Sequence, residues 1–347
     1  GDGGGGDGGG GDTPGNPAFV YSTKTSNSFL RVMDEDGSND RVLSKTLGSG
    51  GGVFGPSPSW SPDGTEVAFS DRKFRKPSGL VVTPLDGSPY PAGDPCSGET
   101  LCILFRNTDD FETGGVGGDP VAWGSTPPSC NSVSSEEDFI AFLGHGFIHS
   151  PGVDDYGLFL ISRENPASSP SALINLTNQP NESLSGVAWS PDGRSVATVA
   201  FSGDFGAGGS GSIAIINVCD GFTRTAITLP DQPLIQGVGS LDWGNQYGQD
   251  YLLVTGGDGV WVVDYVSDPS SPALYQILPD NLHGEIFDSI SAVWSPDSTQ
   301  VAVSYRLLSG DSGMSIIDVT DFENPLELIR PNASEPGRID WKEPAVP

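Results

Sequence analysis

The sequence is poor in basic residues, in histidine and in long apolar runs. Its 347 residues include 16 Lys and Arg against 45 Asp and Glu, which gives a formal net charge of −29. Nucleic acids and anionic lipid surfaces attract proteins through Lys and Arg, so we do not expect this acidic chain to bind either of them. No apolar stretch approaches the roughly 20 residues that cross a bilayer. The only membrane attachment that we expect is therefore a lipid anchor at the N-terminus.

Catalytic motifs are also scarce. GDSG at 310–313 is similar to a protease nucleophile segment, but the three histidines, His145, His149 and His283, stand in no matching context for a catalytic triad. The sequence contains no GxSxG, CxxC or CxxCH string, which argues against a hydrolase elbow, a zinc ribbon and an attached haem. We expect no enzymatic activity and no cofactor.

Two segments contain residue types that bind cations. DEDGSND at 34–40 places Asp34, Asp36 and Asp40 like the acidic ligands of a calcium loop, but Lys45 occupies the place of the final bidentate Glu. His145 and His149 lie four residues apart and are possible imidazole ligands. We interpret the acidic segment as a hairpin turn, with bound Ca²⁺ as the alternative, and the histidines as ordinary residues.

A repeated string organises the chain. SWSPDGTEVAFS at 59–70, AWSPDGRSVATVAF at 188–201 and VWSPDSTQVAVSY at 293–305 each predict a strand ending in Trp, a tight turn and a second strand. Weaker copies are VAWGSTPP at 121–128, LDWGNQYGQDYLLVTGG at 241–257 and RIDWKEP at 338–344. The marker tryptophans are Trp60, Trp123, Trp189, Trp243, Trp294 and Trp341. Their mean spacing of about 56 residues predicts six four-stranded blades, with the tryptophans packed between them.

A second element, a strand followed by an acidic or Gly-containing turn, recurs between the tryptophans. It occupies 29–44, 79–89, 157–165, 212–222, 259–272 and 314–325. Helical periodicity is absent, so we predict an all-β fold. RIDWKEP stops where its partner strand is due, and residues 18–23 supply that pattern at the other end. We predict that this N-terminal strand closes the ring by pairing with the C-terminal blade.

These strings resemble those of TolB-type, WD-repeat-like β-propellers of bacterial envelopes, over nearly all of residues 18–344. The resemblance implies a six-bladed fold and a role as a docking platform for other proteins. We therefore expect a non-enzymatic interaction scaffold that is a subunit of a larger membrane-associated complex. The alternatives are a propeller enzyme of the lactonase, lyase or peptidase type that uses a divalent cation, and a carbohydrate-binding propeller.

The N-terminal segment differs in composition from the rest of the chain. Residues 1–17 are rich in Gly and Asp, which is typical of a flexible tether, and residues 18–347 form the expected propeller. The tether resembles the segment that follows the lipid-modified cysteine of bacterial lipoproteins. We therefore expect a lipid anchor before Gly1 and a location in the periplasm or on the outer face of a bacterial membrane.

Two further clusters are candidates for structural or partner contacts. Cys96 and Cys102 enclose five residues and are the expected disulfide, with buried free thiols as the alternative. The basic residues Arg72, Lys73, Arg75 and Lys76 surround Phe74 and are a candidate contact for an acidic partner, with a solvated loop as the alternative.

Overall fold

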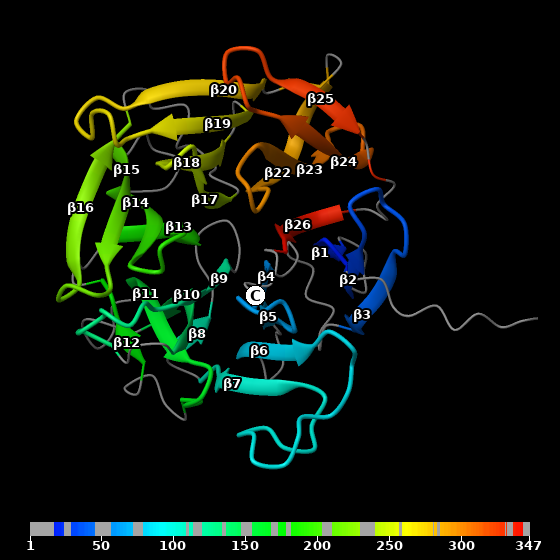
Figure 1. Ribbon diagram of the computed structural model, residues 1–347, viewed down its shortest axis with the longest axis vertical. Helices are drawn as coiled ribbons and strands as arrows, with labels where there is room; N and C mark the ends of the chain where they lie inside the picture. The colour runs from blue at the N-terminus through cyan, green and yellow to red at the C-terminus, as the bar shows by residue number, and fades with distance from the viewer. Residues whose placement is uncertain are drawn as a thin grey trace, which may run out of the picture.

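The computed structural model describes residues 17–23, 29–45, 57–71, 79–108, 111–113, 120–133, 137–146, 155–167, 173–177, 182–202, 210–229, 240–256, 259–279, 281–282, 285–329, 331 and 336–342. Over these ranges the chain forms strands and turns but no helix, and therefore no helix that could cross a membrane. The strands form six antiparallel sheets around a common centre (Figure 1). This arrangement confirms the six-bladed, all-β propeller, although two of the six sheets have five strands instead of the expected four.

Each sheet is one blade. Blade 1 contains β4 (Pro58–Trp60), β5 (Glu66–Asp71), β6 (Gly79–Pro84) and β7 (Cys102–Arg106). Blade 2 contains β8 (Phe111–Thr113), β9 (Val121–Ser125), β10 (Asp138–Gly146), β11 (Asp155–Ser162) and β12 (Ile174–Asn175). Blade 3 contains β13 (Glu182–Trp189), β14 (Ser195–Ser202), β15 (Ser210–Asn217) and β16 (Thr223–Thr228).

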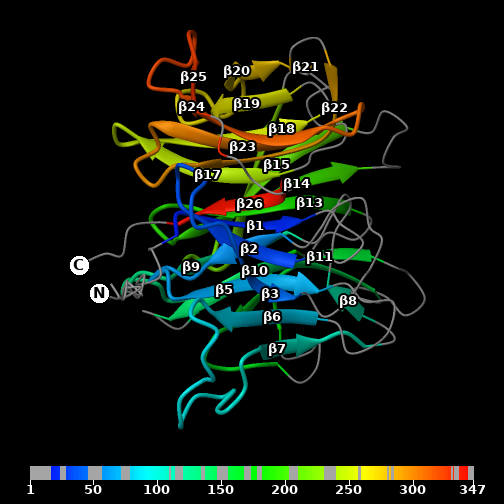
Figure 2. The ribbon, with the colours of Figure 1, turned by 90° about the vertical axis from the view of Figure 1, so that its right-hand side faces the viewer.

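The remaining blades complete the circle. Blade 4 contains β17 (Leu241–Gln246), β18 (Gln249–Gly256), β19 (Gly259–Asp264) and β20 (Ala273–Pro279). Blade 5 contains β21 (Asn281–Leu282), β22 (Glu285–Trp294), β23 (Gln300–Leu307), β24 (Ser312–Asp318) and β25 (Leu326–Ile329). Blade 6 contains β26 (Pro336–Trp341), β1 (Phe19–Thr23), β2 (Phe29–Met33) and β3 (Arg41–Lys45). In the side view of Figure 2 the connection between β6 and β7 projects from the ring at the lower left.

The two ends of the described chain share blade 6. β1 lies between β26 and β2, with Phe19 opposite Trp341 and Val20 opposite Asp340. The backbone N–H of Lys342 also donates to the Ala18 carbonyl oxygen at 2.7 Å. The six inner strands, β4, β9, β13, β17, β22 and β26, contact one another in turn around the whole circle. The predicted closure by the N-terminal strand is therefore confirmed.

The apolar core lies between blades. Among the described residues it consists of six clusters, each shared by two neighbouring blades and each containing one marker tryptophan. These tryptophans are at most 8% exposed. The pleat of β5 turns Val67 and Phe69 toward blade 6 and Ala68 toward blade 2. Both faces of a blade are thus buried, and the tryptophans stabilise the junctions.

The Ser-Pro-Asp-Gly turn after a marker tryptophan is held by its own side chains. The N–H of Gly64 donates to the Ser61 carbonyl at 2.8 Å, and Gly64 has a φ of 67°, which glycine adopts without strain. The Asp63 carboxylate accepts the Ser61 hydroxyl at 2.7 Å and the Thr65 N–H at 3.0 Å. The aspartate in the repeat therefore has a structural role.

Two weaker copies of the repeat differ from the expectation that each marker tryptophan ends its strand. β9 continues to Ser125 beyond Trp123, and β17 continues to Gln246 beyond Trp243. In the stronger copies a proline stands two residues after the tryptophan, fixes φ and begins the turn. The copies at Trp123 and Trp243 have no proline at that place, so the strand continues.

Candidate functional site

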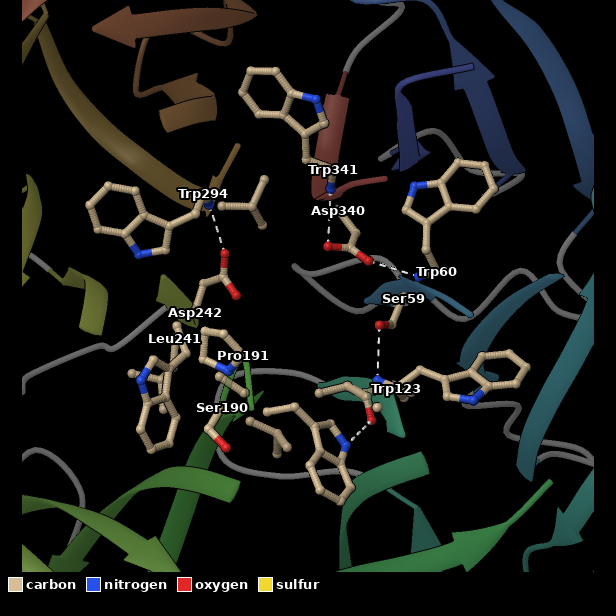
Figure 3. A pocket seen from close by; sticks show the side chains of 18 of the residues that line it. Ser59, Trp60, Trp123, Ser190, Pro191, Leu241, Asp242, Trp294, Asp340 and Trp341 are labelled. Atoms are coloured by element: carbon tan, nitrogen blue, oxygen red, sulfur yellow. Dashed lines mark hydrogen bonds between the residues drawn. The ribbon is translucent and has the colours of Figure 1, made fainter. Parts of the chain in front are cut away.

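The inner strands surround a central hollow of about 470 Å³. Figure 3 shows the rings of Trp60, Trp123, Trp294 and Trp341 pointing away from it, into the spaces between blades. The wall facing the hollow is formed by the residues beside these tryptophans, including Ser, Pro and Asp. Polar and apolar groups therefore both line the centre, while the indole rings are directed away from it.

Polar side chains beside this hollow join neighbouring blades. The Asp340 carboxylate accepts the backbone N–H of Trp60 at 2.7 Å, and the Asp242 carboxylate accepts that of Trp294 at 2.7 Å (Figure 3). The Ser59 hydroxyl accepts the N–H of Trp123 at 3.0 Å. Each acceptor immediately precedes the marker tryptophan of its own blade. Hydrogen bonds to charged acceptors are the stronger kind, so these two carboxylates hold blade junctions together.

A glycine after the tryptophan lets two blades approach closely. The indole N–H of Trp189 donates to the Ala122 carbonyl at 3.0 Å, which places the ring over Gly124. A Cβ atom on Gly124 would lie 2.6 Å from Cγ of Trp189, and one on Gly244 would lie 2.8 Å from Cγ of Trp294. The Trp-Gly pairs therefore make room for the tryptophan of the next blade.

A larger hollow, the turn-face groove, lies over blades 6, 1 and 2. Its volume is about 1280 Å³. It is bordered by the β2–β3 turn, the β4–β5 turn, the β6–β7 connection and the residues after β11. Pro17 and Lys342, next to the strands that close the ring, also line it. The groove is lined by Pro17, Asp34, Asn39, Asp40, Arg41, Asp63, Gly64, Thr65, Glu66, Pro84, Leu85, Asp86, Ser88, Pro89, Tyr90, Pro91, Asp94, Asp138, Arg163, Glu164 and Lys342.

Arg163 connects blade 2 to blade 1 across this groove. Its guanidinium donates to both Glu66 carboxylate oxygens, at 3.0 and 2.9 Å, and to Asp94 at 3.1 Å. The guanidinium carbon also lies 4.9 Å from the centre of the Tyr90 ring. The Arg163 side chain is only 7% exposed, so this is a shielded, bidentate ion pair. It fixes the β6–β7 connection against blade 2.

Comparison with known proteins finds solved structures with a similar fold. No protein-family model matches the sequence, and no curated protein matches it. TolB from Acinetobacter baumannii is similar in structure, with a TM-score of 0.58 at 15% identity, over 94% of this chain and 67% of that one. The chain has the TolB-type propeller fold. A chain in a nidogen/laminin complex has a TM-score of 0.53 at 10% identity, over 93% of this chain and 95% of that one.

In this TolB-type propeller the acidic segment at 34–40 forms the β2–β3 turn. Asp34 accepts the side-chain amide of Asn39 at 2.6 Å, and Asp36 accepts the backbone N–H two residues on at 2.8 Å. Asp40 accepts the Arg31 guanidinium at 2.8 Å. Asp34 and Asp40 line the groove. The carboxylates of Asp34 and Asp36 stabilise the turn itself, and that of Asp40 links it to Tyr21 of β1 and Arg31 of β2.

Of the two histidines considered as metal ligands, His145 is among the described residues. His145 lies in β10, and its ring packs 5.7 Å from that of Tyr156. His149 lies outside the described residues. Within the described ranges, the one group of His, Cys, Asp and Glu side chains close enough to share an ion is Asp94, Cys96 and Cys102. The two sulfurs of that group are bonded to each other.

The basic cluster named from the sequence, Arg72, Lys73, Phe74, Arg75 and Lys76, lies outside the described residues. The structure therefore does not place it relative to the groove, and its role as a partner contact stays a prediction.

The cysteines form two disulfides. Cys96–Cys102 is the pair named from the sequence and lies at the β6–β7 connection. Cys130–Cys219 joins blade 2 to blade 3, with Cα atoms 4.4 Å apart and a sequence separation of 89. Sequence reasoning did not name this second pair, because nothing local marks two cysteines that far apart as neighbours.

Sequence reasoning also missed the residues that shape the groove, among them Tyr90, Asp138 and Arg163. They form no motif, because they come from a connection, a strand start and a strand end in two blades. One signal was available. In a regular propeller the turn after a marker tryptophan and the turn after the third strand lie on the same face, so charges at those positions gather there.

Proposed function

We propose that this chain is a non-enzymatic interaction propeller, an accessory subunit of a larger membrane-associated complex in a bacterial envelope. The observation that carries the proposal is the turn-face groove on a closed ring. Its volume of about 1280 Å³ exceeds the usual range of roughly 300–1,000 Å³ for small-molecule pockets. A hollow of this size, formed by three blades held in register, suits a segment of another protein.

The structural roles of the acidic residues support a non-enzymatic function. Asp63 and Asp297 accept hydrogen bonds within the turns of the repeat, and Asp242 and Asp340 accept backbone N–H groups at blade junctions. Carboxylates used in this way hold the ring in one geometry. A fixed surface loses little conformational freedom on association, which favours binding.

The proposed location outside the cytoplasm has separate support. Disulfides form and persist in oxidising compartments, and this chain contains two. The Gly- and Asp-rich residues 1–17 have the composition of a flexible tether, and the propeller fold is similar to that of TolB. We propose that a lipid on this segment holds the propeller at the membrane surface.

Isolation of the native protein in mild detergent tests the proposal. We expect it to sediment well above its own 36.1 kDa, with other proteins present at fixed stoichiometry, and to have an acyl mass on its N-terminal segment. Recovery as a lone 36.1 kDa species would contradict the interaction role. An N-terminal peptide without an acyl group would contradict only the anchor.

A further inference from the structure

The turn-face groove has a surplus of negative charge that its own cations do not balance. Eight of its lining residues are Asp or Glu, and three are Arg or Lys. The three cations are also engaged within the protein. Arg163 is bound to Glu66 and Asp94, Arg41 donates to a backbone carbonyl at 3.4 Å, and the Lys342 ammonium lies 5.2 Å from the centre of the Trp60 ring.

Asp86, Asp138 and Glu164 remain without a cation. None of them forms an ion pair with a Lys or Arg in the described ranges. Asp86 accepts a backbone N–H at 2.8 Å, and Asp138 accepts the Ser125 hydroxyl. Burial is the main cause that raises the pKa of Asp138, and nearby carboxylates, including that of Glu164, raise it further. A cationic group placed here would stabilise the charged form of Asp138 against both effects.

Tyr90 supplies an independent observation in the same groove. It is only 6% exposed, and its hydroxyl makes no hydrogen bond. Burial first, and then the nearby Glu66 carboxylate, raise the pKa of Tyr90. The Glu66 carboxylate lies near the phenol and is bound by Arg163 through both oxygens, and the Tyr90 hydroxyl does not meet it in hydrogen-bond geometry. A buried phenol without a partner is costly, and a ligand with a hydrogen-bond acceptor would satisfy it.

The volume and apolar lining of the groove favour an extended chain over a single ion. Pro84, Pro89 and Pro91 line it next to Tyr90. Such rings can pack against the aliphatic stems of Lys and Arg while the charged ends reach carboxylates. A peptide also supplies backbone carbonyls, which are the acceptors that the Tyr90 hydroxyl lacks.

We propose that the turn-face groove binds an extended, basic segment of a partner protein. Lys or Arg side chains of that segment face Asp86, Asp138 and Glu164, and a backbone carbonyl accepts the Tyr90 hydroxyl. This inference rests on the proposed interaction function and names the chemistry of the partner.

The test uses the whole chain and a labelled peptide of alternating Lys and Ala, with fluorescence anisotropy as the readout. A peptide of alternating Glu and Ala is the charge control. The groove variant combines Asp86→Asn, Asp138→Asn and Glu164→Gln. We expect it to bind the Lys peptide about tenfold more weakly than the native chain, and we expect binding to weaken as salt is added.

A matched variant has the same change in charge at corresponding places in blades 4 and 5. It combines Asp250→Asn, at the start of β18, with Asp268→Asn, in the β19–β20 turn, and Glu323→Gln, after β24. Asp250 accepts a side chain of the preceding strand as Asp138 does, and Asp268 accepts a backbone N–H two residues on as Asp86 does. We expect this variant to bind the Lys peptide as the native chain does.

The variant Tyr90→Phe tests the proposed hydrogen bond of the Tyr90 hydroxyl without changing the charge of the groove. It removes only the hydroxyl, and we expect a loss of affinity of about fivefold with an unchanged salt dependence. Equal binding to the groove variant and to the matched variant would overturn the inference, because affinity would then follow net charge alone. Lack of binding by the native chain would overturn it too.

Failure of this inference is distinguishable from failure of the proposed function. If the groove variant still assembles into the native complex but the Lys peptide does not bind, the groove inference is wrong and another face contacts the partner. If the Lys peptide binds as expected but the native protein is recovered alone, the subunit role is wrong.

Discussion

Single residues next to the marker tryptophans decide how two blades meet. Ser59, Asp242 and Asp340 precede a tryptophan and accept a backbone N–H of the following blade. Gly124 and Gly244 follow a tryptophan and make room for the indole of the following blade. At these junctions the residue before the marker tryptophan therefore supplies the hydrogen-bond acceptor, and the residue after it leaves space for the indole of the following blade.

Gly124→Ala should lower the free energy of unfolding by about 1–3 kcal/mol, because the added methyl group overpacks the Trp189 ring. Urea unfolding measures the loss. In a Trp189→Ala background the same substitution should cost much less, since the ring that it meets is gone. Equal costs in the two backgrounds would show that the contact with the indole is not the cause.

The turn aspartates should make stability depend on pH in the acid range. Burial acts to raise the pKa of Asp297, but hydrogen bonds from Ser295 and Thr299 outweigh it and hold the pKa below the ordinary 3.8. The folded state therefore binds this proton less readily than the unfolded state. The resulting stabilisation is present above pH 3.8 and is lost as the pH falls through the folded-state value.

We therefore expect Asp297→Asn to lower stability by about 1 kcal/mol at neutral pH and by less below the folded-state pKa. Urea midpoints at neutral and at acid pH measure the difference. Asp311→Asn, at an exposed turn position, is the control and should change stability by no more than about 0.5 kcal/mol at either pH. A constant difference for Asp297→Asn across the pH range would refute this account of the turn.

At the scale of elements, the position of a strand in its blade decides what it tolerates. β1 is an interior strand between β26 and β2, whereas β25 is at the outer edge of blade 5. An interior strand uses its backbone N–H and C=O groups on both sides, and an edge strand leaves one side unpaired. β1, the strand that closes the ring, is therefore an interior strand whose backbone is paired on both sides.

Val20→Pro should destabilise the propeller by about 3 kcal/mol or more, because proline removes an N–H within a central strand. Val20 is fully buried and lies opposite Val32 and Asp340. Leu328→Pro is the control, since Leu328 is 43% exposed in edge strand β25 and falls at a register shift. We expect the control to cost about 1 kcal/mol or less. Similar urea midpoints for the two variants would argue against a stabilising role of β1 as the strand that closes the ring.

At the scale of the whole molecule, covalent links add to the circular packing. Cys130–Cys219 joins two neighbouring blades over a sequence separation of 89, whereas Cys96–Cys102 closes a local loop with a separation of 6. A cross-link restricts the unfolded chain more when it closes a longer loop. The two disulfides should therefore differ in their effect on stability.

Replacing Cys130 and Cys219 with serine should lower the free energy of unfolding by about 4–5 kcal/mol, against about 2 kcal/mol for the Cys96 and Cys102 pair. Equilibrium urea unfolding of the two double variants measures both losses. A larger loss for the local pair would mean that its role in holding the β6–β7 connection outweighs loop length.

The sequence alone determined the all-β class, the number of blades and the strand that closes the ring. These properties follow from sequence patterns, because each strand and turn is encoded over a few adjacent residues, the number of repeats gives the number of blades, and the incomplete patterns at the two ends indicate the closing strand. Trp123 and Trp243 show the limit of such patterns, since the missing proline lets their strands continue past the expected end.

Only the tertiary structure decided where the candidate site lies. Tyr90, Asp138 and Arg163 become neighbours because ring closure fixes blade 1 against blade 2, and Cys130 meets Cys219 for the same kind of reason. No local pattern encodes such contacts, since their energy depends on burial and charge that arise only after the blades have packed. The repeat thus specifies the ring, and the packed ring places the groove.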